Sequence, residues 1–89
     1  IIRQISQVLL QERDMNLNII GYTDSDGDDT ANMKLSEARS EAVKNALVNI
    51  YNIDQQRLTT AGKGESEPVG DNGTVDGKAQ NRRVEFIKI

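Results

Sequence analysis

The chain has 89 residues, enough for one small domain with a modest hydrophobic core. Its net charge of −3 argues against a nucleic-acid ligand, because a nucleic-acid-binding domain needs a basic face. It contains no His and no Cys, so thiol catalysis, thiolate metal sites and disulfides are excluded. We predict no cofactor. No stretch approaches the roughly 20 apolar residues of a membrane helix, so we expect no membrane insertion by this chain.

The first half of the chain shows two helical patterns separated by a strand pattern. Apolar residues at helical spacing predict an amphipathic helix over residues 1–13, and alternation predicts a strand over 16–22. A polar, acidic turn at 23–29 leads into the longest helical pattern, at 30–51. Because the chain starts without Met inside a helical pattern, we expect a fragment of a longer protein.

The second half predicts two further strands. A turn at 52–56 precedes a strand over 57–64, and the last strand covers 82–89. Between them, residues 65–80 are rich in Gly and other turn formers, which predicts a long ordered loop or a loop with one helical turn. The order α-β-α-β-β predicts an α+β domain, residues 1–89, with helices covering one face of a sheet.

An arginine interrupts the apolar face of the long helix. At about 100° per residue, the apolar side chains fill an arc of roughly 180° centred near Ala46 and Ile50, and Arg39 falls inside it. Two interpretations stay open: Arg39 snorkels to the rim of the core, or its charge pairs with an acid or a ligand. Arg39 lies close to the turn carrying Asp24, so an acid and a base would meet where a strand ends.

The acidic turn allows three interpretations. A calcium loop of the EF-hand kind fails, because Asp29 and Leu35 stand where Gly and Glu are required, so only a looser calcium site is compatible. Asp-x-Asp-Gly after a strand resembles the nucleophile motif of haloacid-dehalogenase-like phosphatases, but Asp28 stands where these enzymes have Thr and the chain is too short for their domain. A solvated turn that caps the helix explains Asp28 and Asp29.

Two longer motifs cover residues 16–89. The first consists of Gly21-Tyr22-Thr23-Asp24, Gly27, Asn32, Leu35, Ser36 and Arg39. The second consists of Gly62, Gly64, Glu65, Pro68, Asn72, Thr74, Gly77 and Asn81-Arg82-Arg83-Val84-Glu85. Together they resemble, in residues and spacing, the OmpA-like C-terminal domain of outer-membrane proteins, envelope lipoproteins and flagellar stator subunits. Tyr22 departs from the pattern, since many members have His there.

The resemblance implies a two-layer sandwich with a mixed β-sheet and helices on one face. The family order is βαβαββ, and its first strand, which would precede the first helix, is missing here. The acidic turn that follows that strand usually helps to line the ligand site. Its absence could weaken binding, or leave a sheet edge that pairs with a second copy as a homodimer.

The resemblance also implies a non-enzymatic ligand site. Members bind the diaminopimelate of the peptidoglycan stem peptide without breaking a bond. Asp24 would hold the ligand ammonium and Arg39 its carboxylate, each through a charge-assisted hydrogen bond. Thr23 and Asn32 match positions beside the pocket, although a strand end and a helix cap explain them equally well.

Two further arginines match the second motif. Strand alternation sends Arg82 and Arg83 to opposite faces, so at most one can approach the pocket, and we treat both as structural. The implied role is to anchor an outer-membrane protein or lipoprotein to the cell wall, in the periplasm of a Gram-negative bacterium. The alternative is the anchoring domain of a flagellar stator subunit.

Overall fold

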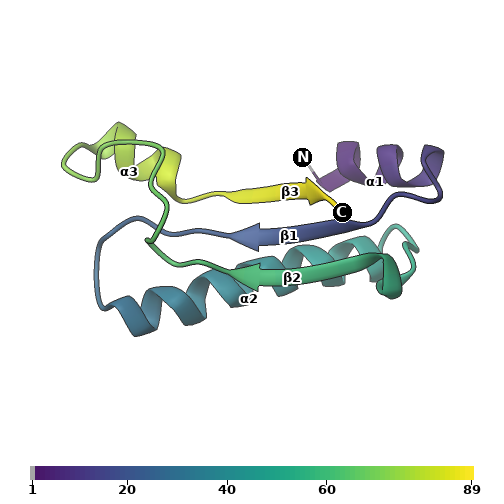
Figure 1. Ribbon diagram of the computed structural model, residues 1–89, viewed down its shortest axis with the longest axis horizontal. Coiled ribbons are helices and arrows are strands. Elements are labelled where there is room, and N and C mark those ends of the chain that lie inside the picture. The colour runs from purple at the N-terminus through teal and green to yellow at the C-terminus, as the bar shows by residue number, and fades with distance from the viewer. Residues whose placement is uncertain (1) are drawn as a thin grey trace.

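The computed structural model describes residues 2–89, and Ile1 of the predicted first helix lies outside them. The elements are α1 (Ile2–Gln11), β1 (Leu17–Gly21), α2 (Asp29–Asn49), a short 3₁₀ helix (Gln55–Arg57), β2 (Leu58–Gly62), α3 (Val75–Asn81) and β3 (Val84–Lys88) (Figure 1). Every predicted helix and strand is present, with ends within about two residues of those expected. Residues 65–80 form a loop that leads into α3, which at seven residues is longer than the single turn considered. The order is therefore α-β-α-β-α-β.

The sheet is mixed and has the order β2-β1-β3. β1 pairs in parallel with β2, from Leu17 opposite Leu58 to Gly21 opposite Gly62. It pairs antiparallel with β3, with Ile19 opposite Phe86. The central position of β1 buries its apolar side chains, and Ile19 is 0% exposed.

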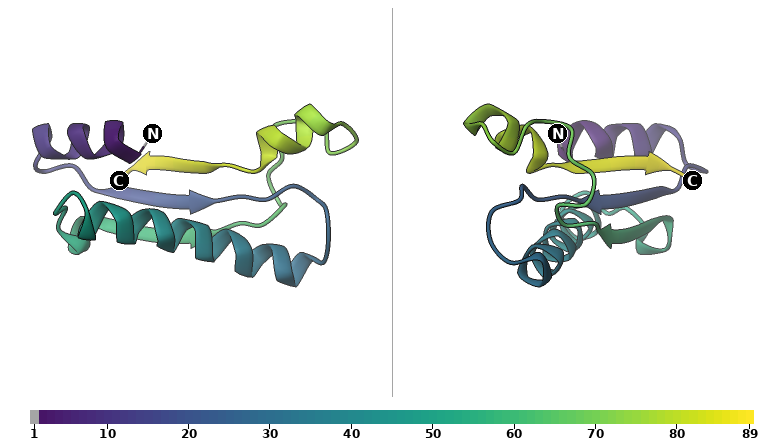
Figure 2. Two further views of the ribbon diagram at one scale, coloured as in Figure 1. Left: turned by 180° about the vertical axis from the view of Figure 1, so that it is seen from behind. Right: turned by 60° about the vertical axis from the view of Figure 1, so that its left-hand side comes forward.

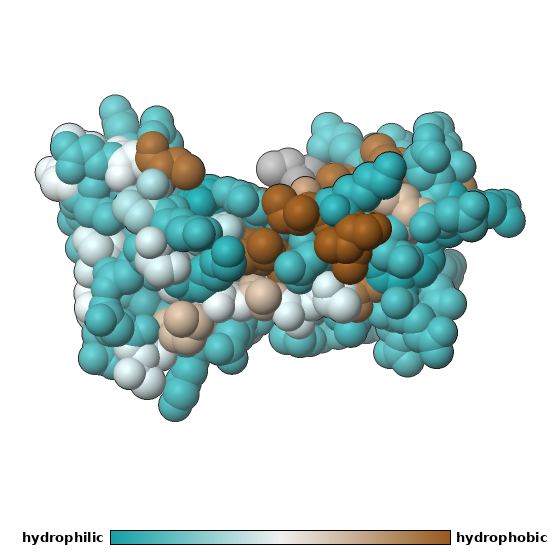
Figure 3. Space-filling view, in the orientation of Figure 1, coloured by the Kyte–Doolittle hydropathy of each residue, from teal (hydrophilic) through white to brown (hydrophobic). Residues whose placement is uncertain are grey.

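Helices α1 and α2 cover the same face of the sheet (Figures 1 and 2). Leu9 of α1 and Leu47 of α2 meet β1 and β2 in one hydrophobic cluster. The remaining buried members of this cluster are Leu17, Ile19, Ile53 and Leu58. Figure 3 views the opposite face, where hydrophobic side chains lie among polar ones. Ile87, which follows the core-contacting Phe86 along β3, is 44% exposed. The predicted α+β two-layer fold with helices on one face is confirmed.

The buried face of α2 is not the predicted one. Ile50, near the centre of the expected arc, is 68% exposed, whereas Ser36 and Ser40 are 0% exposed. The side chains that α2 buries are those of Asn32, Ser36, Ser40 and Leu47. The predicted apolar arc is therefore wrong: the buried face of α2 is rotated from it by part of a turn. Arg39 is half-buried and lies at the edge of the buried face.

A close approach between α2 and the sheet explains the error. A Cβ on Gly21 would collide with the backbone carbonyl of Ser36, and one on Gly62 would lie 2.5 Å from the backbone nitrogen of Glu37. Only small side chains fit at this distance, and the Ser36 hydroxyl keeps its hydrogen bonds by donating to Met33 O and accepting from the N–H of Gly64. At Ser36, size rather than hydrophobicity therefore selects the residue. Within residues 2–89, no helix has the length and apolar character needed to cross a bilayer.

Candidate ligand-binding site

The candidate site lies at the end of the sheet where β1 leads into the acidic turn. Thr23 continues the strand pairing, because its N–H donates to Gly64 O at 2.8 Å. Asp28 caps α2 by accepting from the N–H of Ala31, which confirms the capping interpretation of that residue. Asn32, one turn into α2, donates through Nδ2 to Asp26 O at 2.9 Å and so holds the turn against the helix.

Asp24 sits in this turn with both carboxylate oxygens engaged. Nη1 of Arg82 donates to Oδ2 at 2.6 Å, and the N–H of Asp26 donates to Oδ1 at 3.0 Å. The side chain of Asp24 is 10% exposed, whereas that of Arg82 is 43% exposed. The hydrogen bond from Arg82, helped by that from Asp26, lowers the pKa of Asp24 below its ordinary value. Asp24 is therefore a firmly ionised carboxylate at the rim of the domain.

Arg39 reaches the same end of β1 without pairing with Asp24. Its Nη1 donates to Tyr22 O, two residues before Asp24, over a long 3.4 Å. No salt bridge to an Asp or Glu is formed by Arg39 in the part of the chain that the structure describes. Arg39 is half-buried, and its guanidinium, which carries five N–H donors, makes this one hydrogen bond within residues 2–89.

The two other predicted site residues, Thr23 and Asn32, form hydrogen bonds with the backbone of the acidic turn. Thr23 is 4% exposed, and its hydroxyl donates to Asp24 O at 2.9 Å. Asn32 is 7% exposed and bonds to the turn backbone; it does not cap α2, because Asp28 does. Both residues lie beside Asp24, and their contact with a ligand stays a prediction.

Helix α3 supplies two cations that the sequence analysis did not assign to the site. Lys78 contacts Asp26 at 3.1 Å, and Arg82, four residues later, contacts Asp24. Arg83 instead contacts Tyr22, with its guanidinium carbon 3.7 Å from the ring centroid. Both arginines precede β3, which begins at Val84, so the strand alternation on which the prediction of opposite faces rested does not apply to them. The helical spacing of Lys78 and Arg82 was the available signal, but it went unused because these residues were assigned to a loop and a strand.

Asn81 fixes the loop before α3. Its Oδ1 accepts from the N–H groups of Val69 and Gly70, both at 2.8 Å. Its Nδ2 donates to Gly70 O at 3.0 Å and to Oδ1 of Asn72 at 2.7 Å. The same Asn72 oxygen accepts from the N–H of Ser25, so the loop is tied directly to the acidic turn. The position of α3 and of Arg82 therefore follows from this network.

The carboxylates of the turn do not converge on a common point. Asp24 pairs with Arg82, Asp26 with Lys78, and Asp28 caps the helix. Among residues 2–89 there is no group of three or more side chains placed to hold a metal ion. The geometry thus offers no support for the looser calcium site.

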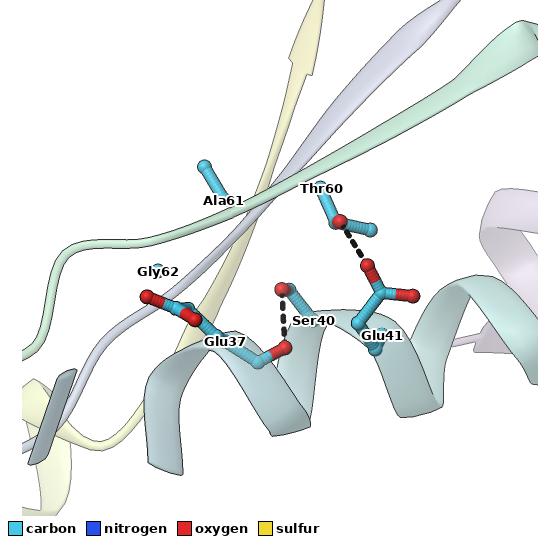
Figure 4. Close-up of a pocket in the computed structure, with 6 residues that line it drawn as sticks. All are labelled: Glu37, Ser40, Glu41, Thr60, Ala61 and Gly62. Carbon is cyan, nitrogen blue, oxygen red and sulfur yellow. Dashed lines mark hydrogen bonds between the residues drawn. The ribbon is translucent and has the colours of Figure 1, made fainter. Parts of the chain in front are cut away.

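A separate cavity of about 380 Å³ lies between α2 and β2 (Figure 4). It is lined by Glu37, Ser40, Glu41, Thr60, Ala61 and Gly62. The hydroxyl of Thr60 donates to Oε1 of Glu41, and the hydroxyl of Ser40 donates to Glu37 O (Figure 4). The cavity includes none of the predicted site residues and carries no cation, so it does not match the predicted ligand.

The OmpA family model matches residues 1–82. The chain belongs to the OmpA family. It is 44% identical over 84 residues to outer membrane porin F of Pseudomonas aeruginosa, covering 94% of this chain and 24% of the porin. It is 43% identical over 82 residues to the probable lipoprotein YiaD of Escherichia coli, covering 92% of this chain and 37% of the lipoprotein. The chain thus spans only a minor part of these relatives.

A third relative and two solved structures extend the comparison. The peptidoglycan-binding protein ArfA of Mycobacterium bovis is 33% identical over 87 residues, 98% of this chain and 26% of ArfA. The peptidoglycan-associated lipoprotein of Burkholderia pseudomallei superposes with a TM-score of 0.91 at 27% identity, covering 99% of this chain and 74% of that one. The C-terminal domain of Helicobacter pylori MotB superposes at 0.89 with 21% identity, covering 99% and 68%, which shows the shared fold.

The family membership decides between the enzyme and binding interpretations. OmpA-like domains are structural anchoring domains rather than enzymes, so the prediction of a non-enzymatic domain is confirmed. The phosphatase alternative has no support in the family or in the three-stranded mixed sheet.

Proposed function

We propose that this domain binds peptidoglycan non-covalently, through the diaminopimelate of the stem peptide. The observation that carries the proposal is that Asp24 and Arg39 lie at the same end of β1 without pairing with each other. One is an ionised carboxylate at the rim, and the other is a half-buried guanidinium with a single long hydrogen bond. The names of two similar proteins, a peptidoglycan-binding protein and a peptidoglycan-associated lipoprotein, support this ligand class.

The ligand chemistry fits these two groups. The side-chain end of diaminopimelate carries an ammonium and a carboxylate on one carbon, so a neighbouring acid and base can hold both. Asp24 would accept from the ammonium, and the planar fork of Arg39 would grip the carboxylate at two points. Hydrogen bonds to charged groups contribute about 1.5–3 kcal/mol each, so two of them suit a recognisable but reversible contact. Thr23 and Asn32 would shape the pocket beside Asp24.

The role of the whole protein belongs to the same proposal. The similarity to an outer-membrane porin and a lipoprotein supports an anchor between the outer membrane and the cell wall, in the periplasm of a Gram-negative bacterium. For the flagellar stator alternative, the support is limited to the fold that the chain shares with the C-terminal domain of MotB. Pairing of two copies along a sheet edge stays a prediction; β2 and β3 form the two edges of the sheet in residues 2–89.

Titration calorimetry with a soluble diaminopimelate tripeptide stem tests the binding site. Arg39→Ala should weaken binding at least about tenfold, because the ligand carboxylate loses a charged partner worth about 1.5 kcal/mol or more. The fold should survive, since Ala suits a helix and Arg39 forms no ion pair within residues 2–89. Circular dichroism checks that it does.

Arg13→Ala is the matched control, because Arg13 is exposed and lies in the turn after α1, outside the candidate site. It removes the same charge and should bind as the unaltered domain does. Absence of heat and of chemical-shift change near Asp24 at millimolar peptide would refute the proposed function. Normal binding by Arg39→Ala would make Arg39 a snorkelling residue and refute its role.

A further inference from the structure

The carboxylate that should receive the ligand ammonium already has a cation beside it. Oδ2 of Asp24 lies 2.6 Å from Nη1 of Arg82, and Oδ1 is taken by the N–H of Asp26. Since the Asp24 side chain is only 10% exposed, an incoming ammonium has little open surface to approach. The ligand must therefore displace the guanidinium or share the carboxylate with it.

The backbone of Arg82 is held by α3, whereas its side chain is partly exposed. Arg82 is the C-cap of α3, where its N–H donates to Lys78 O at 3.2 Å. Its side chain is 43% exposed, and the contact with Asp24 is the one side-chain hydrogen bond it forms within residues 2–89. A change of rotamer would release the carboxylate without disturbing α3.

We propose that Arg82 determines specificity by exchanging partners: it yields Asp24 to the ligand ammonium and then donates to the carboxylate on the same ligand carbon. This inference rests on the function proposed above. Asp24, Arg39 and Arg82 together carry one excess positive charge, while Lys78 and Asp26 neutralise one another beside them. An ammonium with an adjacent carboxylate fits this charge arrangement better than an ammonium alone.

The exchange explains how a small site could reject a lysine-type stem. A lysine ammonium would displace Arg82 and leave the guanidinium with no new partner, so one charge-assisted hydrogen bond is lost for the one gained. Diaminopimelate returns a partner to Arg82. Discrimination between the two stems then depends on whether Arg82 regains a hydrogen-bond partner, as well as on the other contacts with the ligand.

Competition binding with diaminopimelate-type and lysine-type tripeptide stems tests the exchange. The unaltered domain should prefer the diaminopimelate stem by at least about tenfold, or about 1.4 kcal/mol. In Arg82→Ala the diaminopimelate stem should bind more weakly, while the lysine stem should bind as well or better, because Asp24 is no longer occupied. The preference should shrink by about tenfold. Arg13→Ala is the matched control, since it removes an exposed arginine outside the candidate site and should keep the preference.

The outcomes separate the possibilities. Equal weakening of both stems by Arg82→Ala would mean that Arg82 only positions Asp24, and unchanged binding of both would make it a bystander; either result overturns the inference. If Arg82→Ala does not fold, Arg82→Lys replaces it: a lysine can pair with Asp24 but cannot grip a carboxylate as a fork, so it too should lower the preference. Failure of the unaltered domain to bind the diaminopimelate stem would instead overturn the proposed function.

Discussion

At the scale of single residues, the side chain of Asn81 uses its full hydrogen-bonding capacity inside the domain. Its amide makes two donor and two acceptor contacts with the loop before α3, and it is 0% exposed. Because Arg82 follows directly, the same contacts fix the residue that pairs with Asp24. A buried polar side chain whose hydrogen bonds are all made favours a single conformation of the loop, because other conformations would break those bonds; an apolar residue would not do so.

Asn81→Ala should lower the free energy of unfolding by about 2 kcal/mol, because it leaves the N–H groups of Val69 and Gly70 without a buried acceptor. Urea denaturation measures the loss. Asn81→Asp keeps the acceptor oxygen and should retain more of the stability. If both variants match the unaltered domain, the loop is held by other contacts.

Arg82 shows what a single residue adds to the site. Sequence motifs identified it, but the expected strand alternation allowed at most one of Arg82 and Arg83 to approach the pocket, without saying which. The structure places it on Asp24, so the free site contains an acid already paired with a base. Its effect on a ligand depends on that pairing, which no local pattern contains.

At the scale of elements, the contact between α2 and the sheet depends on glycines. Gly21 of β1 faces the backbone carbonyl of Ser36, and Gly62 of β2 faces the backbone nitrogen of Glu37. Since backbone atoms cannot rotate away, an added methyl group would force the helix off the sheet. The acidic turn connects β1 to α2, so a displaced helix would also disturb Asp24 and Arg39.

Gly21→Ala should therefore lower the free energy of unfolding by about 2–3 kcal/mol, as expected for overpacking against a rigid neighbour. Gly73→Ala is the matched control: its methyl group would meet a side-chain oxygen of Asp71 at 3.1 Å, which can move. Thermal and urea denaturation of the two variants provide the comparison. Equal stability of both variants would show that α2 can shift without cost.

At the scale of the whole molecule, Arg57 connects the segment before β2 to the end of α1 and the loop that follows it. Its guanidinium donates to Leu9 O at 2.9 Å, Glu12 O at 2.8 Å and Met15 O at 3.0 Å. Leu9 lies in the last turn of α1, where carbonyls have no partner inside the helix. A cation at a helix C-terminus also interacts favourably with the helix dipole. Arg57 thus holds α1 to the start of β2, across more than half the chain.

Arg57→Met keeps most of the aliphatic stem but removes these donors. It should lower the free energy of unfolding by about 2 kcal/mol and speed hydrogen exchange at the end of α1. Hydrogen exchange followed by NMR measures the effect residue by residue, with Arg13→Met as the control for charge. Unchanged protection in α1 would contradict the proposed tie.

The sequence by itself determined the type and order of nearly all elements, because helix and strand periodicity are properties of a few neighbouring residues. It also identified the Asp28 cap and the arrival of Asp24 and Arg39 at the same end of β1. Each of these follows from local geometry.

Only the tertiary structure decided the partner of Asp24, since Arg82 is separated from it by 58 positions. It also decided which face of α2 is buried, because the fit against Gly21 depends on the distance between a helix and a sheet. Helix α3 likewise stands where Gly residues predicted a loop, held by the contacts of Asn81. Contacts between distant segments set distances and charges that no local period encodes, and the binding site is built from such contacts.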